Sequence, residues 1–144
     1  MSKIQWNDEL SVGVELIDDQ HKELIRIANG LMNAIRIGRD KRVVTNVIRR
    51  LREYTIFHFH SEEALMEKAH YPNRGEHEAE HGKLKRDVKQ FQRELYKKKD
   101  LNPEHVLEFL KTWLLKHILS ADREFARYLK EQPKKKTVAV LGGN

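Results

Sequence analysis

The chain alternates four long amphipathic stretches with short polar breaks. Within each stretch, the residues of one face, mostly apolar side chains and histidines, recur mainly at steps of three and four, which is the period of an α-helix. In the first stretch they are His21, Leu24, Ala28, Leu31 and Ile35. The second, over residues 41–69, has Val44, Val47, Leu51, Thr55, His58, Glu62 and Leu65. The third has His77, His81, Leu84, Val88, Phe91 and Leu95, and the fourth Val106, Leu110, Trp113, Leu114, His117, Ala121, Phe125 and Tyr128.

Capping and turn residues separate these stretches. A carboxylate at Asp18 or Asp19 can accept free amide protons at the start of the first helix. Gly38 tolerates the left-handed backbone that ends it. The segment 71–75, Tyr-Pro-Asn-Arg-Gly, breaks the second stretch from the third with turn residues. Asn102 can cap the fourth helix, with Pro103 at the first helical position, where its missing amide proton costs nothing.

Four amphipathic helices with short connections predict an all-α, up-down-up-down four-helix bundle over residues 19–131. Residues 1–18 have no long period and are predicted to form an N-terminal arm. The arm would pack Ile4, Trp6, Val12 and Val14 across the bundle. Residues 132–144 are predicted to be a flexible, basic C-terminal tail.

Composition narrows the class of protein. A chain of 144 residues fits one domain with its own core. The absence of cysteine excludes disulfides, zinc ribbons, thiolate-bound iron–sulfur clusters and cysteine nucleophiles. No apolar run approaches the roughly 20 residues that span a bilayer, and the amino terminus lacks an apolar signal core. We therefore expect a soluble, cytoplasmic protein, and a monomer.

The net charge of +6 changes this picture little. Lysines and arginines are spread over the predicted helix faces, with clusters at residues 97–99 and 134–136. The first cluster lies where a helix should end, and cations there are favoured by the helix dipole. No basic stripe is interleaved with aromatic residues, so we expect no nucleic-acid partner.

Five histidines and two carboxylates on the inner faces form the candidate chemistry. They are His21, His58, Glu62, His77, His81, His117 and Asp122. His58 and Glu62 lie four residues apart, as do His77 and His81, so each pair is separated by about 40° around its helix and can reach one centre. Burying so many polar groups without partners would cost several kcal/mol each. Imidazole and carboxylate bind first-row metals, and this number of ligands suits two ions.

The remaining histidines, His60, His70 and His105, lie off the inner faces and are predicted to be surface or loop residues. His117 and Asp122 present a different difficulty, because residues five apart on a regular α-helix differ by about 140°. We predict a π-type or otherwise irregular turn between them, since such bulges gather at functional sites.

The sequence resembles the hemerythrins, and most closely their single-domain bacterial branch, the bacteriohemerythrins. The resemblance covers about Trp6 to Tyr128. The residues that carry it are Ser11-Val-Gly-Val14, Ile17-Asp-Asp-Gln-His21, His58-Phe59 with Glu62, Leu65-Met66, His77 with His81, and Trp113-Leu-Leu-Lys-His117-Ile118 with Asp122. No ligand position departs from the family pattern.

This resemblance implies a non-haem di-iron centre. His77, His81 and His117 would complete one iron ion, and His21 and His58 would bind the other, which keeps an open position. Glu62 and Asp122 would bridge the two ions, together with a solvent-derived hydroxo or oxo group. By the same resemblance, the dioxygen pocket would be lined by Leu24, Phe59, Trp113, Leu114 and Ile118.

The function implied is reversible dioxygen binding, in a carrier, storage or delivery protein that is not an enzyme and has an oxygen-consuming client enzyme as partner. The alternatives are a di-iron oxidase, peroxidase or nitric-oxide-handling enzyme, and a sensor of oxygen or iron. Ferritin-like oxidases build their site from paired Glu-x-x-His motifs. No such pair supplies this centre, and its abundance of imidazole favours the carrier. Imidazole also suits zinc and other transition ions.

Overall fold

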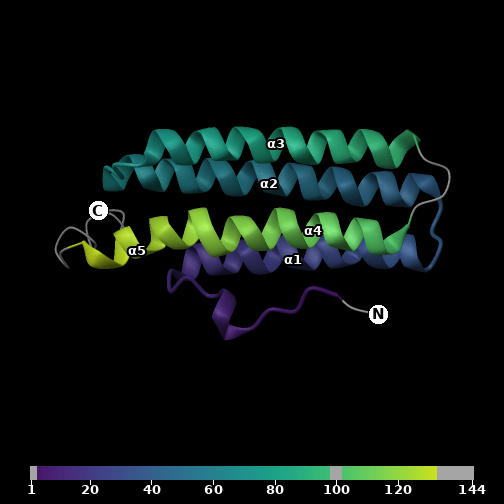
Figure 1. Cartoon of the computed structure of the whole chain (residues 1–144), viewed down its shortest axis with the longest axis horizontal. Helices are drawn as coiled ribbons and strands as arrows, with labels where there is room; N and C mark the ends of the chain where they lie inside the picture. The colour runs from purple at the N-terminus through teal and green to yellow at the C-terminus, as the bar shows by residue number, and fades with distance from the viewer. Residues whose placement is uncertain (1–2, 98–101, 133–144) are drawn as a thin grey trace.

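The computed structural model describes residues 3–97 and 102–132, apart from the side chains of Ile118 and Leu119. Its long helices are α1 (Glu15–Arg36), α2 (Lys41–Ala69), α3 (Arg74–Lys97) and α4 (Pro103–His117). The π-helical segment η2 (Ile118–Asp122) joins α4 to α5 (Arg123–Glu131), so that these three form one rod along α1 (Figure 1). The predicted all-α four-helix bundle is confirmed, and the described residues contain no strand.

Local capping explains most of the helix boundaries. Gly38 has a left-handed φ of 79°, and the amide of Arg39 donates to the carbonyl of Ala34 to close α1. The amide of Val43 donates to the Asp40 side chain at the start of α2. Asn102 caps α4 through the amide of Glu104, with Pro103 as the first helical residue, as predicted.

The predicted cap of the first helix at Asp18 or Asp19 is wrong. Helix α1 begins at Glu15, and Val14 precedes it without a side-chain cap. The Asp18 carboxylate instead accepts hydrogen bonds from the Ser11 hydroxyl at 2.6 Å and the Val12 amide at 2.8 Å. This carboxylate therefore holds the arm against α1 from within the first turn of the helix.

The arm before α1 packs beside the bundle and contains a short 3₁₀ turn, η1 (Asp8–Leu10) (Figure 1). Ile4 exchanges two hydrogen bonds with the Asn29 side chain, at 2.9 and 2.8 Å. Ile4 and Val12 are buried, while Trp6 and Val14 are partly buried, so all four predicted arm contacts are made.

A layer of buried polar residues divides the apolar core in two. The larger cluster includes Leu24, Leu51 and Leu114. The smaller one, near the turn between α2 and α3, includes Ile17, Leu65 and Phe125. The candidate ligands lie between these clusters, on the four long helices and the π-helical segment, so apolar side chains seal the polar layer from both ends. Within the described ranges, no helix is long and apolar enough to cross a membrane.

Helix α2 ends at a left-handed residue that is not glycine. His70 has φ 56° and ψ 46°, and the amide of Tyr71 donates to the carbonyl of Met66, which completes a Schellman motif. A side chain in this conformation costs about 1 kcal/mol relative to glycine. We therefore expect His70→Gly to raise the melting temperature by about 3 °C, measured by circular dichroism.

The equivalent position in α1 provides the matched control. Gly38 adopts a similar conformation, and a Cβ there would meet no other atom within 4 Å. The substitution Gly38→Ala should therefore lower the melting temperature through backbone strain alone, by a comparable amount. Changes of the same sign in the two variants would contradict the assignment of strain to the left-handed backbone.

Candidate metal centre

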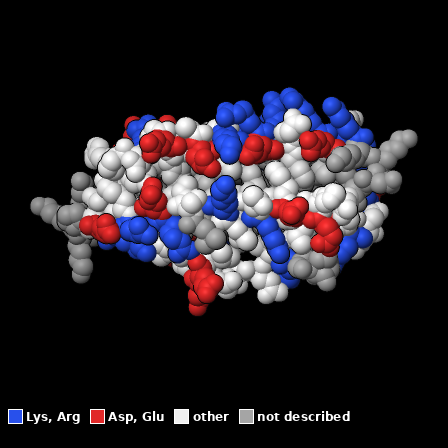
Figure 2. Space-filling view, viewed as in Figure 1, with Lys and Arg blue, Asp and Glu red and all other residues white. Residues whose placement is uncertain are grey.

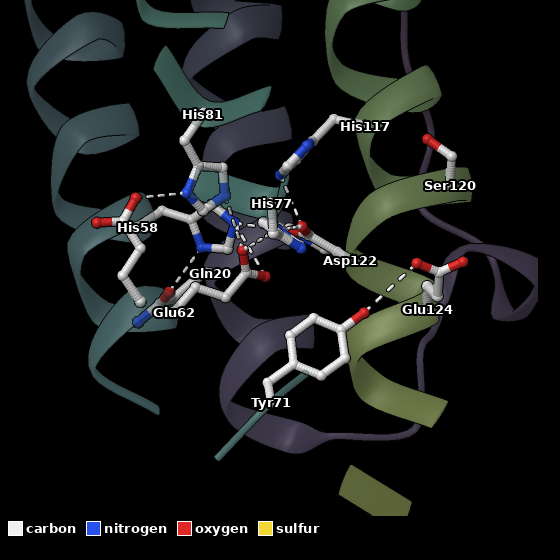
Figure 3. A network of polar contacts seen from close by, with 12 residues as sticks. Gln20, His58, Glu62, Tyr71, His77, His81, His117, Ser120, Asp122 and Glu124 are labelled. Atoms are coloured by element: carbon white, nitrogen blue, oxygen red, sulfur yellow. Dashed lines mark hydrogen bonds and ion pairs between the residues drawn. The ribbon is translucent and has the colours of Figure 1, made fainter. Parts of the chain in front are cut away.

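The seven candidate ligands converge in one layer of the bundle, and Figure 3 labels all of them except His21. Helix α1 supplies one of them, α2 two and α3 two, α4 supplies one, and the last stands at the end of the π-helical segment. In that order they are His21, His58, Glu62, His77, His81, His117 and Asp122, and none is more than 5% exposed. The structure therefore brings all seven together, while His60, His70 and His105 are exposed, as predicted.

A π-helical turn brings Asp122 to the side of His117. The segment Ile118–Asp122 is π-helical, which confirms the predicted irregular turn. A π turn holds more residues than an α turn, so five residues complete slightly more than one revolution. As a result, Asp122 Oδ1 lies 2.7 Å from His117 Nε2.

The two oxygens of Asp122 face different pairs of imidazoles. Oδ2 lies 2.6 Å from His21 Nε2 and 3.1 Å from His58 Nε2. Oδ1 lies 3.1 Å from His77 Nε2, in addition to its contact with His117. The carboxylate thus lies between two groups of nitrogens, as a bridging ligand would.

Glu62 repeats this arrangement from the opposite helix. Its Oε1 lies 3.1 Å from His77 Nε2 and 3.0 Å from His81 Nε2. Its Oε2 faces His58 Nε2 at 3.7 Å. Two ligand groups result, and each could hold an ion: Glu62, His77, His81, His117 and Asp122 in one, and His21, His58, Glu62 and Asp122 in the other.

Two outer contacts orient the imidazoles, and the sequence did not predict either. His58 Nδ1 lies 2.7 Å from Gln20 Oε1, while Gln20 Nε2 donates to the Ser61 hydroxyl at 3.0 Å. His81 Nδ1 lies 2.7 Å from Glu63 Oε2. Because these oxygens accept protons from Nδ1, the Nε2 lone pairs of both rings point into the centre. The one available signal was an amide on the inner face of α1, directly before His21.

Burial favours the neutral form of two of the histidines, His58 and His81. It is the largest influence on His58 and lowers its pKa to about 4, although Asp122 opposes the shift. Burial also lowers the pKa of His81, and the neighbouring His77 and His117 lower it further. Neutral imidazole is the form that binds a metal.

The two carboxylates are shifted in opposite directions. Burial and the nearby charge of Asp122 raise the pKa of Glu62 well above its usual range. Burial also opposes ionisation of Asp122, but the imidazoles of His117, His21 and His58 outweigh it and hold its pKa well below the usual range. The metal-free layer thus keeps one carboxylate charged and favours the protonated form of the other.

The arrangement of the buried polar atoms fits metal ions. Glu62 Oε2 is buried with no hydrogen-bond partner. His117 Nε2 lies 2.7 Å from Asp122 Oδ1, but without the geometry of a hydrogen bond. At His58 and His81, acceptor lone pairs on nitrogen face carboxylate oxygens, which is favourable only with a cation between them. An octahedral ion with bonds of about 2.1 Å separates adjacent ligand atoms by about 3 Å, and six of the seven contacts measure 2.6–3.1 Å.

Four of the five predicted pocket residues line one small apolar cavity. Leu24, Phe59, Trp113 and Leu114 surround it, together with Thr55, Leu84 and His117. Its volume is about 10 Å³, which is the lower limit for holding one water-sized molecule. Leu24 and Thr55 lie one helical turn from His21 and His58 of the four-ligand group, while His117, which itself lines the cavity, belongs to the five-ligand group. The cavity therefore adjoins both groups. The side chain of Ile118 lies outside the described residues.

The protein is thus an antiparallel four-helix bundle with a buried layer of imidazoles and shared carboxylates. This combination is typical of helical metal-binding proteins. The sequence model of the hemerythrin HHE cation binding domain matches residues 12–129. The chain therefore belongs to the hemerythrin family.

Individual relatives agree with this assignment. The chain is 32% identical to a bacteriohemerythrin of Clostridium acetobutylicum, over 83% of this chain and 96% of that protein. It is 33% identical to a bacteriohemerythrin of Pseudomonas aeruginosa, over 85% of this chain and 78% of that protein. Its fold superimposes on the crystal structure of wild-type hemerythrin with a TM-score of 0.77 and 26% identity, covering 88% of this chain and 97% of that one.

Proposed function

We propose that this protein binds dioxygen reversibly at a centre of two iron ions and acts as a carrier, storage or delivery protein. The observation that carries the proposal is the unequal division of the buried ligands. One group has five members, the other has four, and Glu62 and Asp122 belong to both. A centre built in this way would give one ion fewer protein ligands than the other and so would leave room for dioxygen beside it.

The two groups of ligands indicate how the two ions would be held. His77, His81 and His117 would hold the first iron ion, and His21 and His58 the second. Glu62 and Asp122 would bridge the two, with a solvent-derived oxo or hydroxo group as third bridge. Iron bound there would supply the electrons for reversible binding of dioxygen.

The protein's own residues would protect this exchange. The Glu62 and Asp122 carboxylates would offset half of the charge of two divalent ions, and a bridging hydroxide would offset one more unit, which reduces the cost of burying the ions. The apolar cavity beside Leu24 and Leu114 would admit a small neutral molecule and disfavour water, because its walls offer few polar partners.

A carrier fits these ligands better than an oxidase does. Oxidases of the ferritin type rely on glutamates and paired Glu-x-x-His motifs, whereas five imidazoles surround only two carboxylates here. We therefore propose that the chain does not turn over substrates. The cytoplasmic location, the monomeric state and an oxygen-consuming client enzyme stay predictions.

Stoichiometry tests this function. The metal-free protein is titrated with Fe(II) without oxygen, and dioxygen uptake and release are then measured with an electrode. We expect about two iron ions per chain and one dioxygen per pair, recovered when the oxygen pressure falls. Dioxygen that is consumed without being recovered would favour a di-iron enzyme.

The cavity wall gives a more specific prediction. Leu114→Ala should enlarge the cavity and admit water, so oxidation of the reduced, iron-loaded protein in air should become faster, by about tenfold. The rate is followed by stopped-flow absorption. Leu110→Ala is the matched control, because Leu110 is equally buried but does not line the cavity. Equal acceleration in both variants would mean that general loosening of the core, not the cavity, sets the rate.

The outer contact at His58 gives another prediction. Gln20→Leu removes the oxygen that orients this ring and should weaken iron binding by about 10- to 100-fold. Ser61→Ala removes only the hydroxyl that holds the Gln20 amide, so its effect should be smaller. Competition with a chelator measures both affinities. If Ser61→Ala proves the more damaging, the Gln20 contact does not position His58.

A further inference from the structure

A cleft of about 320 Å³ lies between the beginning of α2 and the end of α3, far from the metal centre. Among its lining residues, Ile48 and Gln92 come closest along the helices to His58 and His81. They are ten and eleven residues away, or about 15 Å at the rise of an α-helix. The proposed iron site neither uses the cleft nor explains it.

The floor of the cleft is apolar. Val44, Ile48 and Leu95 are buried residues of the main core and present their side chains at its base. Tyr96 lines the rim and is 64% exposed, one of the few large apolar side chains so exposed in the described part of the chain. Exposed apolar surface of this kind, rimmed by polar residues, is typical of binding sites.

The rim of the cleft is cationic. Arg39, Lys41, Arg93 and Lys97 line it, and no acidic residue does so among those described. Lys41 is held in place, because its ammonium donates to the Tyr96 carbonyl and lies 5.2 Å from the centre of the Tyr96 ring.

The surroundings reinforce this positive potential. Residues 41–56 and 82–97 carry eleven lysines and arginines against three acidic residues, a net charge of +8. The rest of the chain is therefore net −2. Figure 2 shows lysines and arginines gathered over the part of the molecule where α3 approaches its end. Such a field concentrates anions near the cleft.

We propose that this cleft binds a small amphiphilic anion, an unbranched apolar chain that ends in a carboxylate or phosphate group. The apolar chain would lie on Val44, Ile48 and Leu95, and the anionic head would pair with Arg93 and Lys41. The volume lies at the lower end of the range for small-molecule sites, and such sites combine an apolar lining with a few polar anchors. An extended nucleic-acid backbone or a flat bilayer surface would use the positive charge but leave the apolar floor unoccupied.

Calorimetric titration of the iron-loaded protein with decanoate and with decyl phosphate tests this proposal. We expect saturable binding of one molecule per chain, and the tighter of the two ligands identifies the preferred head group. Arg93→Glu should weaken binding by about tenfold or more, the scale of one lost charge-assisted hydrogen bond. Thr45→Trp, which places bulk on the partly buried wall, should weaken it without changing any charge.

Arg49→Glu is the matched control, because it makes the same charge change on α2 outside the cleft. It should alter the affinity by less than about twofold, since exposed charges at a distance are screened by salt. Two results would overturn the proposal that the cleft is the binding site, and would favour a diffuse basic surface instead. One is an equal loss of affinity in Arg49→Glu and Arg93→Glu, and the other is stronger binding to anionic phospholipid vesicles than to either ligand. Absence of saturable binding to both ligands would also overturn the proposal. Retained iron content and helicity in each variant show that it is folded.

Discussion

Asp122→Asn is expected to abolish the paired metal site while preserving the fold. The substitution keeps the size of the side chain but leaves only one oxygen, because the amide nitrogen cannot serve as a ligand. Each oxygen of Asp122 now faces a different pair of imidazoles, with His21 and His58 on one side and His77 and His117 on the other. We expect iron content to fall from about two ions per chain to one or fewer, measured by elemental analysis after reconstitution.

Glu124→Gln is the control, because it makes a similar change on an exposed residue of α5 two positions away. This variant should retain the full iron content. The metal-free Asp122→Asn protein should still show a cooperative, fully helical transition, since the apolar clusters on either side of the layer are untouched. Two ions bound per chain in Asp122→Asn would mean that Asp122 is not a bridge.

Iron loading is expected to raise the melting temperature by about 10 °C. A ligand that binds only the folded protein stabilises it by about 4 kcal/mol when present at a thousand times its dissociation constant. For a chain of this size, each kcal/mol shifts the transition by about 3 °C. The metal ions would also give a partner to Glu62 Oε2, which is buried without a hydrogen bond in the metal-free layer. Differential scanning calorimetry with and without Fe(II), under argon, measures the shift.

A chelator should reverse this stabilisation, and Ca²⁺, which prefers oxygen ligands, should not reproduce it. The Asp122→Asn variant should show only a small part of the shift. A melting temperature that is the same with and without iron would contradict the placement of the ions within the buried layer.

Much of the fold followed from the sequence because its signals are local. Gly38 and Asn102 mark helix ends through the backbone of their own neighbours, so their roles could be predicted without knowing the tertiary structure. The π turn was also predictable. Both His117 and Asp122 are expected to face the core, and a regular α-helix cannot turn two residues five positions apart to the same side. The start of α1 was predicted wrongly because the Asp18 carboxylate accepts hydrogen bonds from Ser11 and Val12 of the arm. These contacts depend on how the arm folds back against α1, which the sequence does not reveal.

The ligand layer was visible in the sequence because repeated inward histidines are costly to bury unless something binds them. Its outer contacts were not visible. Gln20 reaches His58 from another helix, across 38 residues of sequence, and Glu63 reaches His81 across 18. The cationic cleft was missed for a similar reason. Its lysines and arginines appear evenly spread along the sequence, and only the antiparallel pairing of α2 with α3 brings them to one end of the bundle.

The most direct test of reversible dioxygen binding is an optical spectrum of the reduced, iron-loaded protein, recorded under argon, in air, and again under argon. We predict a colourless reduced form, a visible absorption band that develops in air, and loss of that band when oxygen is removed, over repeated cycles. Asp122→Asn, treated in the same way, should develop no band. A wild-type band that never forms, or that decays at once to a permanently oxidised state, would contradict reversible binding and favour a di-iron enzyme or a sensor.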